Sequence, residues 1–495
     1  MPRSASFAIL KPLIVAALAV ACFFACAPSS AFASCIPSQS ELEAYEADGT
    51  LAQRQAYQKA LGNDSFDQEL LEGLQERQGA ASSRSARGKV PPASVSGMPL
   101  EGTAKVLALR VSFPAEGDEE AMAFDEGDTL KALQAMIDGT ADAAPYESLN
   151  AYYGRSSYGR LSFTGRAYDY AAKHCRSYYT DRVDELFREA VTALKEQGVD
   201  VASFDGNEDG LIDGVYLHFA GKTTGWGTTW WSNHRKSSDT EPIEGTQVRL
   251  GSEILLHEPA NENGSTETII HETGHALGLP DFYSYKAGSS SGINTHDMMF
   301  DNVGDQCAFS KWVLGWISNL DITRVKVSND GVWVKRGDGE PEHFDGSVTE
   351  ALQSMNLSDK ETGGFVAVAG DLTSSVDGRS FDLFDEDGLL SSFYLLQLDN
   401  QVGNQDAESV LENGALRMYR VQAELDDSGS DFLESNAYGV DGDKLIEALG
   451  AEGDGFNALK QGASVTPFTN PSTNFAGGLA GGFTGISVER THGEE

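Results

Sequence analysis

Residues 271–281 constrain the fold and chemistry of this chain more than any other segment, because they read H-E-x-x-H-x-x-G-x-x-D. Two histidines four residues apart lie on one face of a helix, so both imidazoles can reach one metal ion. Glu272 lies close enough to act on a metal-bound water without binding the metal itself. Gly278 can end the helix, since glycine adopts backbone angles that other residues avoid. The chain can then turn back and bring Asp281 to the metal as a third ligand.

Three protein ligands and one open position are typical of a catalytic zinc site. The predicted zinc ligands are therefore His271, His275 and Asp281, and Glu272 is the predicted general base. The alternative is an ordinary amphipathic helix whose histidines face solvent. Residues 267–270 are apolar enough to bury the start of the helix, which favours the metal site.

A methionine follows the motif in the sequence His296-Asp297-Met298-Met299. A methionine that packs under the imidazoles of a zinc site fixes their positions. H-E-x-x-H followed by such a Met-turn is part of the metzincin signature. An alternative, a pair of core methionines, is compatible with this role.

The charge of the chain restricts its partners. Its 495 residues carry a formal net charge of -39, so phosphates would be repelled and nucleic acid is excluded as a natural partner. The content of hydrophobic residues is 40%, which is enough to bury real cores.

The N-terminus is typical of an export signal. Arg3 and Lys11 precede an apolar run over residues 13–27, and Ala31-Phe32-Ala33 offers a cleavage site. We therefore expect a signal peptide over residues 1–33, a secreted protein and no stable membrane insertion after processing. The alternatives are an uncleaved membrane anchor or a lipid on Cys22 or Cys26.

Residues 34–98 are predicted to be a pro-segment with a flexible linker, as a zymogen would require. Residues 40–78 are acidic and amphipathic and should be mostly helical. Residues 80–97 are rich in Ala, Ser, Gly and Pro, and their basic residues are candidate processing sites. A linker without processing is the alternative. Cys35 could bind the zinc in the zymogen, and Cys175 with Cys307 is a plausible disulfide.

Residues 99–320 are predicted to form an α+β catalytic domain. Residues 105–113 and 214–221 are expected to be strands, with the first of them central in a sheet. Residues 181–197 have apolar positions at helical spacing and should form a long helix backing that sheet. The active-site helix is expected over residues 265–277.

Residues 321–495 are predicted to form a β-rich, sandwich-like region, since short apolar runs recur between acidic, glycine-rich turns. The clearest runs are residues 364–368, 393–398 and 416–421. One short helix is expected near residues 443–449.

A second metal site is suggested by residues 205–213, which place oxygen ligands at alternate positions with glycine at the sixth. This pattern matches the front half of an EF-hand calcium loop. The calcium ligands would be the side chains of Asp205, Asn207, Asp209 and Asp213 and the carbonyl of Leu211. The usual glutamate at position twelve is replaced by Tyr216, so an acidic turn without calcium is the alternative.

A loop before the catalytic helix gathers Trp226, Trp230, Trp231 and His234. These side chains could line a substrate groove, although core packing is the more common role of tryptophan.

The motif and its surroundings resemble the immune inhibitor A family of secreted bacterial metallopeptidases, within the metzincin-like zincins. The resemblance covers roughly residues 100–320 and includes the strand ending in Phe113-Pro114, residues 152–161, the aspartate-rich loop, and residues 271–281. It implies the same zinc ligands and general base, a zincin-like catalytic domain with a twisted sheet, and Met299 as the Met-turn methionine. Asp301 stands where the family has a tyrosine that could help hold the oxyanion, so Tyr283 or Tyr285 would have to replace it.

The sequence thus predicts a secreted zinc metalloendopeptidase that hydrolyses extracellular proteins or peptides. One alternative is a decayed protease domain that now serves as an adhesin or binding protein. Another is a zinc amidase or esterase acting on cell-wall material.

Overall fold

The computed structural model describes residues 36–81, 94–139, 147–257, 266–289, 293, 297–328, 331–344, 364–370, 382–399, 403, 415–439 and 444–449, and the pairs 458–459, 464–465 and 488–489. The predicted signal peptide, Cys35 and most of the predicted linker lie outside these residues. Within them, no helix combines the length and the apolar character that crossing a membrane would take.

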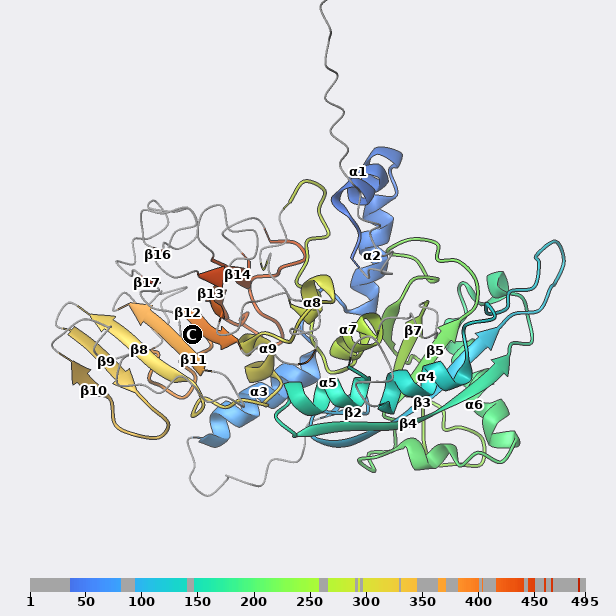
Figure 1. Ribbon diagram of the computed structural model, residues 1–495, viewed down its shortest axis with the longest axis horizontal. Helices are drawn as coiled ribbons and strands as arrows, with labels where there is room; N and C mark the ends of the chain where they lie inside the picture. The colour runs from blue at the N-terminus through green and yellow to red at the C-terminus, as the bar shows by residue number, and fades with distance from the viewer. Residues whose placement is uncertain are drawn as a thin grey trace, which may run out of the picture. The chain divides into compact units, whose positions relative to one another are not determined.

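The first sheet has five strands in the order β4-β3-β5-β7-β6 (Figure 1). Neighbouring strands are parallel except for β6, which is antiparallel to β7 at the edge. Their bounds are β3 Gly102–Ser112, β4 Leu161–Ala171, β5 Gly214–Phe219, β6 Asn233–Lys236 and β7 Ser252–Leu256. The strands expected over residues 105–113 and 214–221 are confirmed as β3 and β5.

Side chains of β3 alternate between two buried faces of this sheet, as a central parallel strand requires. Ala104, Val106 and Ala108 share one core with α4 (Leu130–Asp138), α5 (Leu149–Ser156) and α7 (Glu267–Ala276). Leu107, Leu109 and Val111 share a second core with α6 (Val183–Glu196). The predicted backing helix over residues 181–197 is therefore confirmed as α6, and α7, which covers the predicted active-site helix, lies on the opposite face.

The predicted helical character of residues 40–78 is confirmed by α1 (Gln39–Asp48), α2 (Leu51–Leu61) and α3 (Gln68–Ala81). Gly49 and Gly62 end the first two helices in the left-handed conformation. Leu70, Leu71 and Leu74 of α3 are buried in the main core. The last residues of the predicted linker are ordered, because β1 (Ser94–Val95) pairs with β2 (Met98–Pro99).

Short elements connect these layers. They are the 3-10 helices η2 (Arg176–Tyr179) and η3 (Val201–Phe204) and the helices α8 (Met298–Asp301) and α9 (Ala308–Val313). Cys175 lies just before η2, and Cys307 lies just before α9. Both thiols are free, so the expected disulfide between them is wrong. Each thiol is buried in its own part of the fold, and burial raises the pKa of Cys307 to about 12.

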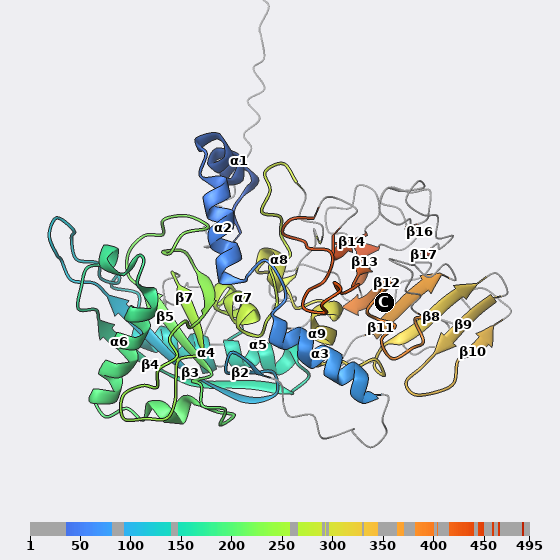
Figure 2. The ribbon, with the colours of Figure 1, turned by 180° about the vertical axis from the view of Figure 1, so that it is seen from behind.

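The C-terminal part contains a sheet of eight strands, which Figure 2 shows from behind. Its order is β10-β9-β8-β11-β12-β13-β14, with β15 paired to β13, and β8 with β11 is its parallel pair. The bounds are β8 Thr323–Ser328, β9 Gly331–Lys335, β10 Glu342–Phe344, β11 Gly364–Gly370, β12 Ser392–Asp399, β13 Ala415–Gln422, β14 Ile446–Ala448 and β15 Ala458–Leu459. A separate pair joins β16 (Ser464–Val465) to β17 (Val488–Glu489). The three predicted strands are confirmed as β11, β12 and β13.

The short helix expected near residues 443–449 is wrong, because Ile446–Ala448 forms strand β14 against Tyr419–Val421 of β13. The backbone of β13 offers hydrogen-bonding groups at this edge, and pairing with them buries Ile446 and Ala448 in the main core.

The β-rich character of the C-terminal region is confirmed, and the expected sandwich stays a prediction, because much of the region, including residues 345–363 and 371–381, lies outside the described residues. One face of the sheet, including Phe365, Phe393 and Leu395, joins the main core that also contains α3, α7 and α9. Among the described residues, the only other sheet in this region is the β16–β17 pair. The sheet therefore packs against helices on that face, and the catalytic and C-terminal regions share one core.

Candidate metal centre

Helix α7 is held in place by contacts to the sheet and to α5. The hydroxyl of Tyr216 on β5 lies 2.9 Å from Oγ1 of Thr273, and Tyr153 on α5 donates to the carbonyl of Ile270 at 2.8 Å. Every residue of α7 is buried. Gly278 follows the helix with a φ of +95°, so the chain turns there as the sequence predicts.

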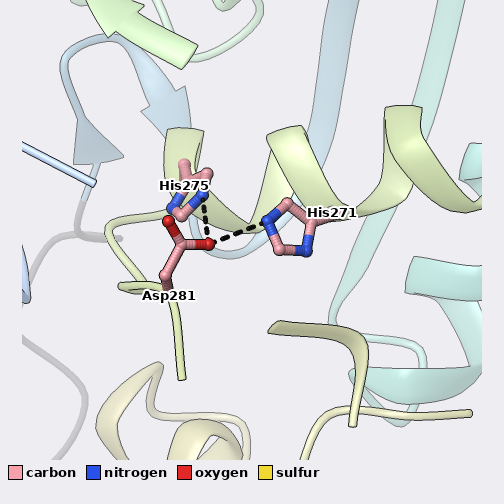
Figure 3. A group of neighbouring side chains, drawn as sticks. All are labelled: His271, His275 and Asp281. Atoms are coloured by element: carbon pink, nitrogen blue, oxygen red, sulfur yellow. Dashed lines mark hydrogen bonds and ion pairs between the residues drawn. The ribbon is translucent and has the colours of Figure 1, made fainter. Parts of the chain in front are cut away.

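The turn brings Asp281 back to the two histidines (Figure 3). Oδ1 of Asp281 lies 3.1 Å from Nε2 of His271 and 3.3 Å from Nε2 of His275. One ligand atom from each of the three residues lies within 4.8 Å of the others, and all three are buried. In the described part of the chain, no other group of three His, Cys, Asp or Glu residues meets this criterion.

Both imidazoles are oriented by backbone carbonyls on the side away from Asp281. Nδ1 of His271 donates to the carbonyl of Met298 at 2.7 Å, and Nδ1 of His275 donates to the carbonyl of Leu279 at 2.7 Å. A carbonyl can only accept, so these bonds place a proton on each Nδ1 and direct each Nε2 toward Asp281, where it could bind a metal once it carries no proton of its own. Two imidazole nitrogens and one carboxylate oxygen with this support fit zinc.

Asp281 is ionised, as a metal ligand must be. Burial would raise its pKa, but the neighbouring His275 and the hydrogen bonds from both imidazoles hold the pKa below its usual range. Its second oxygen, Oδ2, accepts a hydrogen bond from the hydroxyl of Tyr285 at 2.5 Å. Burial and the charge of Asp281 raise the pKa of Tyr285 well above its ordinary value, so this hydroxyl keeps its proton.

The two tyrosines considered as replacements at position 301 thus have different surroundings. Tyr285 uses its hydroxyl on Asp281, whereas the ring of Tyr283 stacks on His271 with centroids 6.5 Å apart. Asp301 itself accepts a hydrogen bond from the backbone of Asp297 at 3.3 Å. Asp301 therefore takes part in closing its own turn.

Met299 lies under α7, at the place that the sequence predicts. A Cβ added to Gly274 would come within 2.3 Å of Sδ of Met299, so the sulfur touches the helix between the two histidines. The turn is fixed by Asp297, whose carboxylate accepts from the backbone N–H groups of Met299 and Cys307 at 2.8 Å each. The carbonyl of Met299 also accepts from Phe282, which ties the turn to the loop carrying Asp281.

Glu272 follows His271 on α7 and is 1% exposed. A carboxylate in this position shares the water-poor surroundings of the ligands, which strengthens its interactions with a substrate or a water. This burial is compatible with the predicted role of Glu272 as general base, which stays a prediction.

The loop over residues 205–213 holds its carboxylates in a different way. Asp205 accepts from the backbone of Asp209 and Gly210, and Asp213 accepts from the backbone of Gly206 and Lys105. Asp213 is fully buried, and burial raises its pKa to about 7. Several of these lone pairs serve the loop backbone, so calcium binding by Asp205, Asn207, Asp209, Leu211 and Asp213 stays a prediction.

The tryptophans before the catalytic helix are mostly part of the core. Trp226 is fully buried with its ring 5.0 Å from that of Tyr285, and Trp230 packs on Phe113 and Phe219. Core packing, which we considered the more common role, is therefore confirmed for Trp226 and Trp230.

The N-terminal helices contact the loop that carries Asp281, which the sequence did not indicate. The backbone N–H of Asp281 donates to the carbonyl of Asn63 at 2.8 Å, and that of Asp67 donates to the carbonyl of Gly278 at 2.9 Å. Lys236 on β6 pairs with the carboxylate of Asp67 at 2.6 Å. Residues 63–67 thus hold both the turn after α7 and the edge strand.

Comparisons with known proteins found a distant relative of this chain. No family model matches the chain. The chain is similar to immune inhibitor A from Bacillus thuringiensis subsp. alesti, with 25% identity over 390 residues. The match covers 64% of this chain and 51% of that protein, so this chain spans about half the length of its relative. On the site residues and this match together, the chain resembles the immune inhibitor A family.

Proposed function

We propose that this chain is a zinc endopeptidase that acts on extracellular proteins or peptides. The observation that carries the proposal is the convergence of His271, His275 and Asp281, whose ligand atoms lie within 4.8 Å of one another at a buried site. The similarity to immune inhibitor A supports it, as does the general-base candidate Glu272 on the same helix. The predicted export signal accounts for the extracellular substrate.

His271, His275 and Asp281 would hold a zinc ion, which would supply Lewis acidity toward a water and a substrate carbonyl. Glu272 then accepts the proton of the attacking water and passes it to the leaving nitrogen of the peptide. The carbonyls of Met298 and Leu279 keep both imidazoles oriented during this cycle. Tyr285 holds Oδ2 of Asp281 and so keeps Oδ1 directed at the histidines.

We also propose that residues 34–98 act as a pro-segment that must move before a protein substrate can bind. Residues 63–67 form hydrogen bonds to the turn that carries Asp281, and Asp67 forms an ion pair with Lys236 of the edge strand β6.

A second candidate function, a zinc amidase or esterase of cell-wall material, would use the same groups. A decayed binding protein would keep the fold without the reaction.

The test is Glu272→Gln in residues 34–495, prepared with zinc and treated so that the N-terminal segment can be cleaved. We expect intact zinc binding, and a loss of casein hydrolysis by roughly 10²- to 10⁴-fold, because the proton acceptor is gone. His271→Ala should lose both zinc and activity. Glu267→Gln, on the same helix, is the matched control and should keep both.

Two results would contradict the proposal. If Glu272→Gln hydrolysed casein as fast as the wild-type protein, Glu272 would not be the base. If the zinc-loaded wild-type protein cleaved no peptide but hydrolysed cell-wall amides or esters, the second candidate would replace the first; if it cleaved neither, the chain would be a binding protein.

A further inference from the structure

A cavity of about 350 Å³ adjoins the metal centre. Its walls include His275 and Leu279, His234 and Arg235 of β6, and residues 59–62, Ser65 and Asp67 of the N-terminal segment. A space of this size can hold one amino-acid side chain with part of its backbone. Because His275 is a proposed zinc ligand, the cavity adjoins one side of the proposed metal centre.

His234 is the unusual member of this wall. Its side chain belongs to β6, is only 3% exposed, and has an Nε2 atom that finds no hydrogen-bond partner among the described residues. Leaving a buried polar atom unpaired destabilises the folded state, so most such atoms in folded proteins have a partner. A ligand that enters the cavity can supply the missing partner.

His234 does not belong to the metal-binding group. The described residues that can place ligand atoms within 4.8 Å of one another are His271, His275 and Asp281. His234 lines the same cavity as His275 without joining this group, so it faces the space beside one of the proposed ligands. Neither Asp301 nor Tyr285 can serve a substrate in this way, because each side chain is bonded within the fold.

We propose that His234 is a substrate-binding residue whose Nε2 donates a hydrogen bond to a main-chain carbonyl of the peptide held in this cavity. The proposal rests on the proposed peptidase function and assigns the role expected of a tyrosine at position 301 to a residue of the edge strand. A neutral imidazole can donate from Nε2, so the contact needs no added charge. Movement of residues 59–67 would open the cavity to the substrate.

The test compares His234→Phe and His234→Gln with the wild-type protein, after cleavage of the N-terminal segment, on a fluorogenic peptide. We expect His234→Phe to lower kcat/KM by about 10²-fold, mostly through kcat, since one donor to the developing charge is lost. Zinc content and the unfolding midpoint should not fall. His234→Gln keeps a donor on a shorter side chain and should recover part of the loss. His257→Gln, outside the cavity, is the control and should leave kcat/KM unchanged.

A binding measurement separates this proposal from the proposed function. A phosphinic peptide, which cannot be hydrolysed, should bind the zinc-loaded wild-type protein more tightly than His234→Phe in calorimetry, by about 10-fold. If the wild-type protein hydrolyses no peptide, the proposed function fails, while the binding comparison still decides the role of His234. Unchanged kcat/KM and unchanged binding in His234→Phe would overturn the role, and so would loss of zinc in both variants.

Discussion

At the scale of single residues, the metal centre depends on atoms that bind no metal. Gly274 lies between the two histidines on α7 and faces Met299. A Cβ at this position would lie 2.3 Å from Sδ and 3.1 Å from Cε of Met299. The glycine thus allows the methionine to touch the backbone of the helix, and the carbonyl of the residue before Met299 orients His271. Any side chain at position 274 would push the turn and the helix apart.

Gly274→Ala should therefore destabilise the protein by about 1–3 kcal/mol, the usual cost of overpacking a core, and should weaken zinc binding. Gly154→Ala on α5 is the matched control, because a Cβ there meets nothing within 4 Å. That control should stabilise the protein by about 0.5–1 kcal/mol, since alanine favours a helix over glycine. Urea unfolding and zinc competition measure both effects. Equal stability of the two variants would show that Met299 does not pack on Gly274.

The convergence of His271, His275 and Asp281 could be predicted from the sequence because they lie close together along the chain and the spacing of the histidines is set by helix geometry. The contact between Gly274 and Met299 joins two separate segments of the chain. No repeating sequence pattern links these segments, so this contact could not be predicted. The hydrogen bond from Tyr285 to Asp281 could be found only once the loop path was known, because either of two neighbouring tyrosines could have supplied it.

At the scale of elements, the edge of the first sheet contains a buried acid. Glu253 on β7 is fully buried and lies opposite Arg235 of β6. Burial raises its pKa to about 8, the charge of Asp184 adds to this, and Ser237 and Arg235 partly offset it. An unfolded glutamate has a pKa of about 4.3, so the folded state holds this proton more tightly than the unfolded state. The stability that Glu253 contributes is therefore fully present below about pH 4 and is lost as pH rises toward 8.

Glu253→Gln should flatten this part of the stability profile. As pH rises from 5 to 9, the free energy of unfolding of the wild-type protein should fall relative to that of Glu253→Gln, by on the order of 3 kcal/mol in total. Glu244→Gln, at an exposed position, is the control and should leave the profile unchanged. Urea unfolding at several pH values gives the comparison. A constant difference between Glu253→Gln and the wild-type protein would mean that Glu253 is ionised throughout.

Elements with a clear period could be predicted from the sequence, and an ambiguous one could not. The apolar positions of α6 recur at helical spacing along more than three turns of residues 183–196, and the structure follows them. Leu445, Ile446 and Leu449 fit a helical turn as well as a short strand. These residues form a strand because the backbone of β13 pairs with Ile446–Ala448 in the sheet. Contacts of this kind between distant segments override local preference.

At the scale of the whole molecule, the C-terminal region contacts the loop that carries Asp281. Tyr285 donates its backbone N–H to the carbonyl of Ala437 at 3.0 Å, and Asn436 donates its side-chain amide to the carbonyl of Phe282. Oε1 of Gln397 on β12 accepts from the first residue of α9 at 2.8 Å. These bonds lie at the border of a core that both regions share. The boundary expected at residue 320 followed a change in sequence pattern, which carries no information on whether two regions pack together.

Residues 34–495 should consequently unfold in a single calorimetric transition, because the two regions cannot expose their common core separately. Zinc should raise the midpoint of the whole transition, since it binds only the folded state. Residues 34–320 alone should show no cooperative transition and little zinc binding, because removal of the sheet uncovers the apolar surface beneath it and frees the loop at Tyr285. The comparison needs scanning calorimetry and zinc titration of both chains. Two separate transitions in the longer chain, with a zinc-sensitive one that the shorter chain reproduces, would contradict the shared core and make the C-terminal sheet an independent domain.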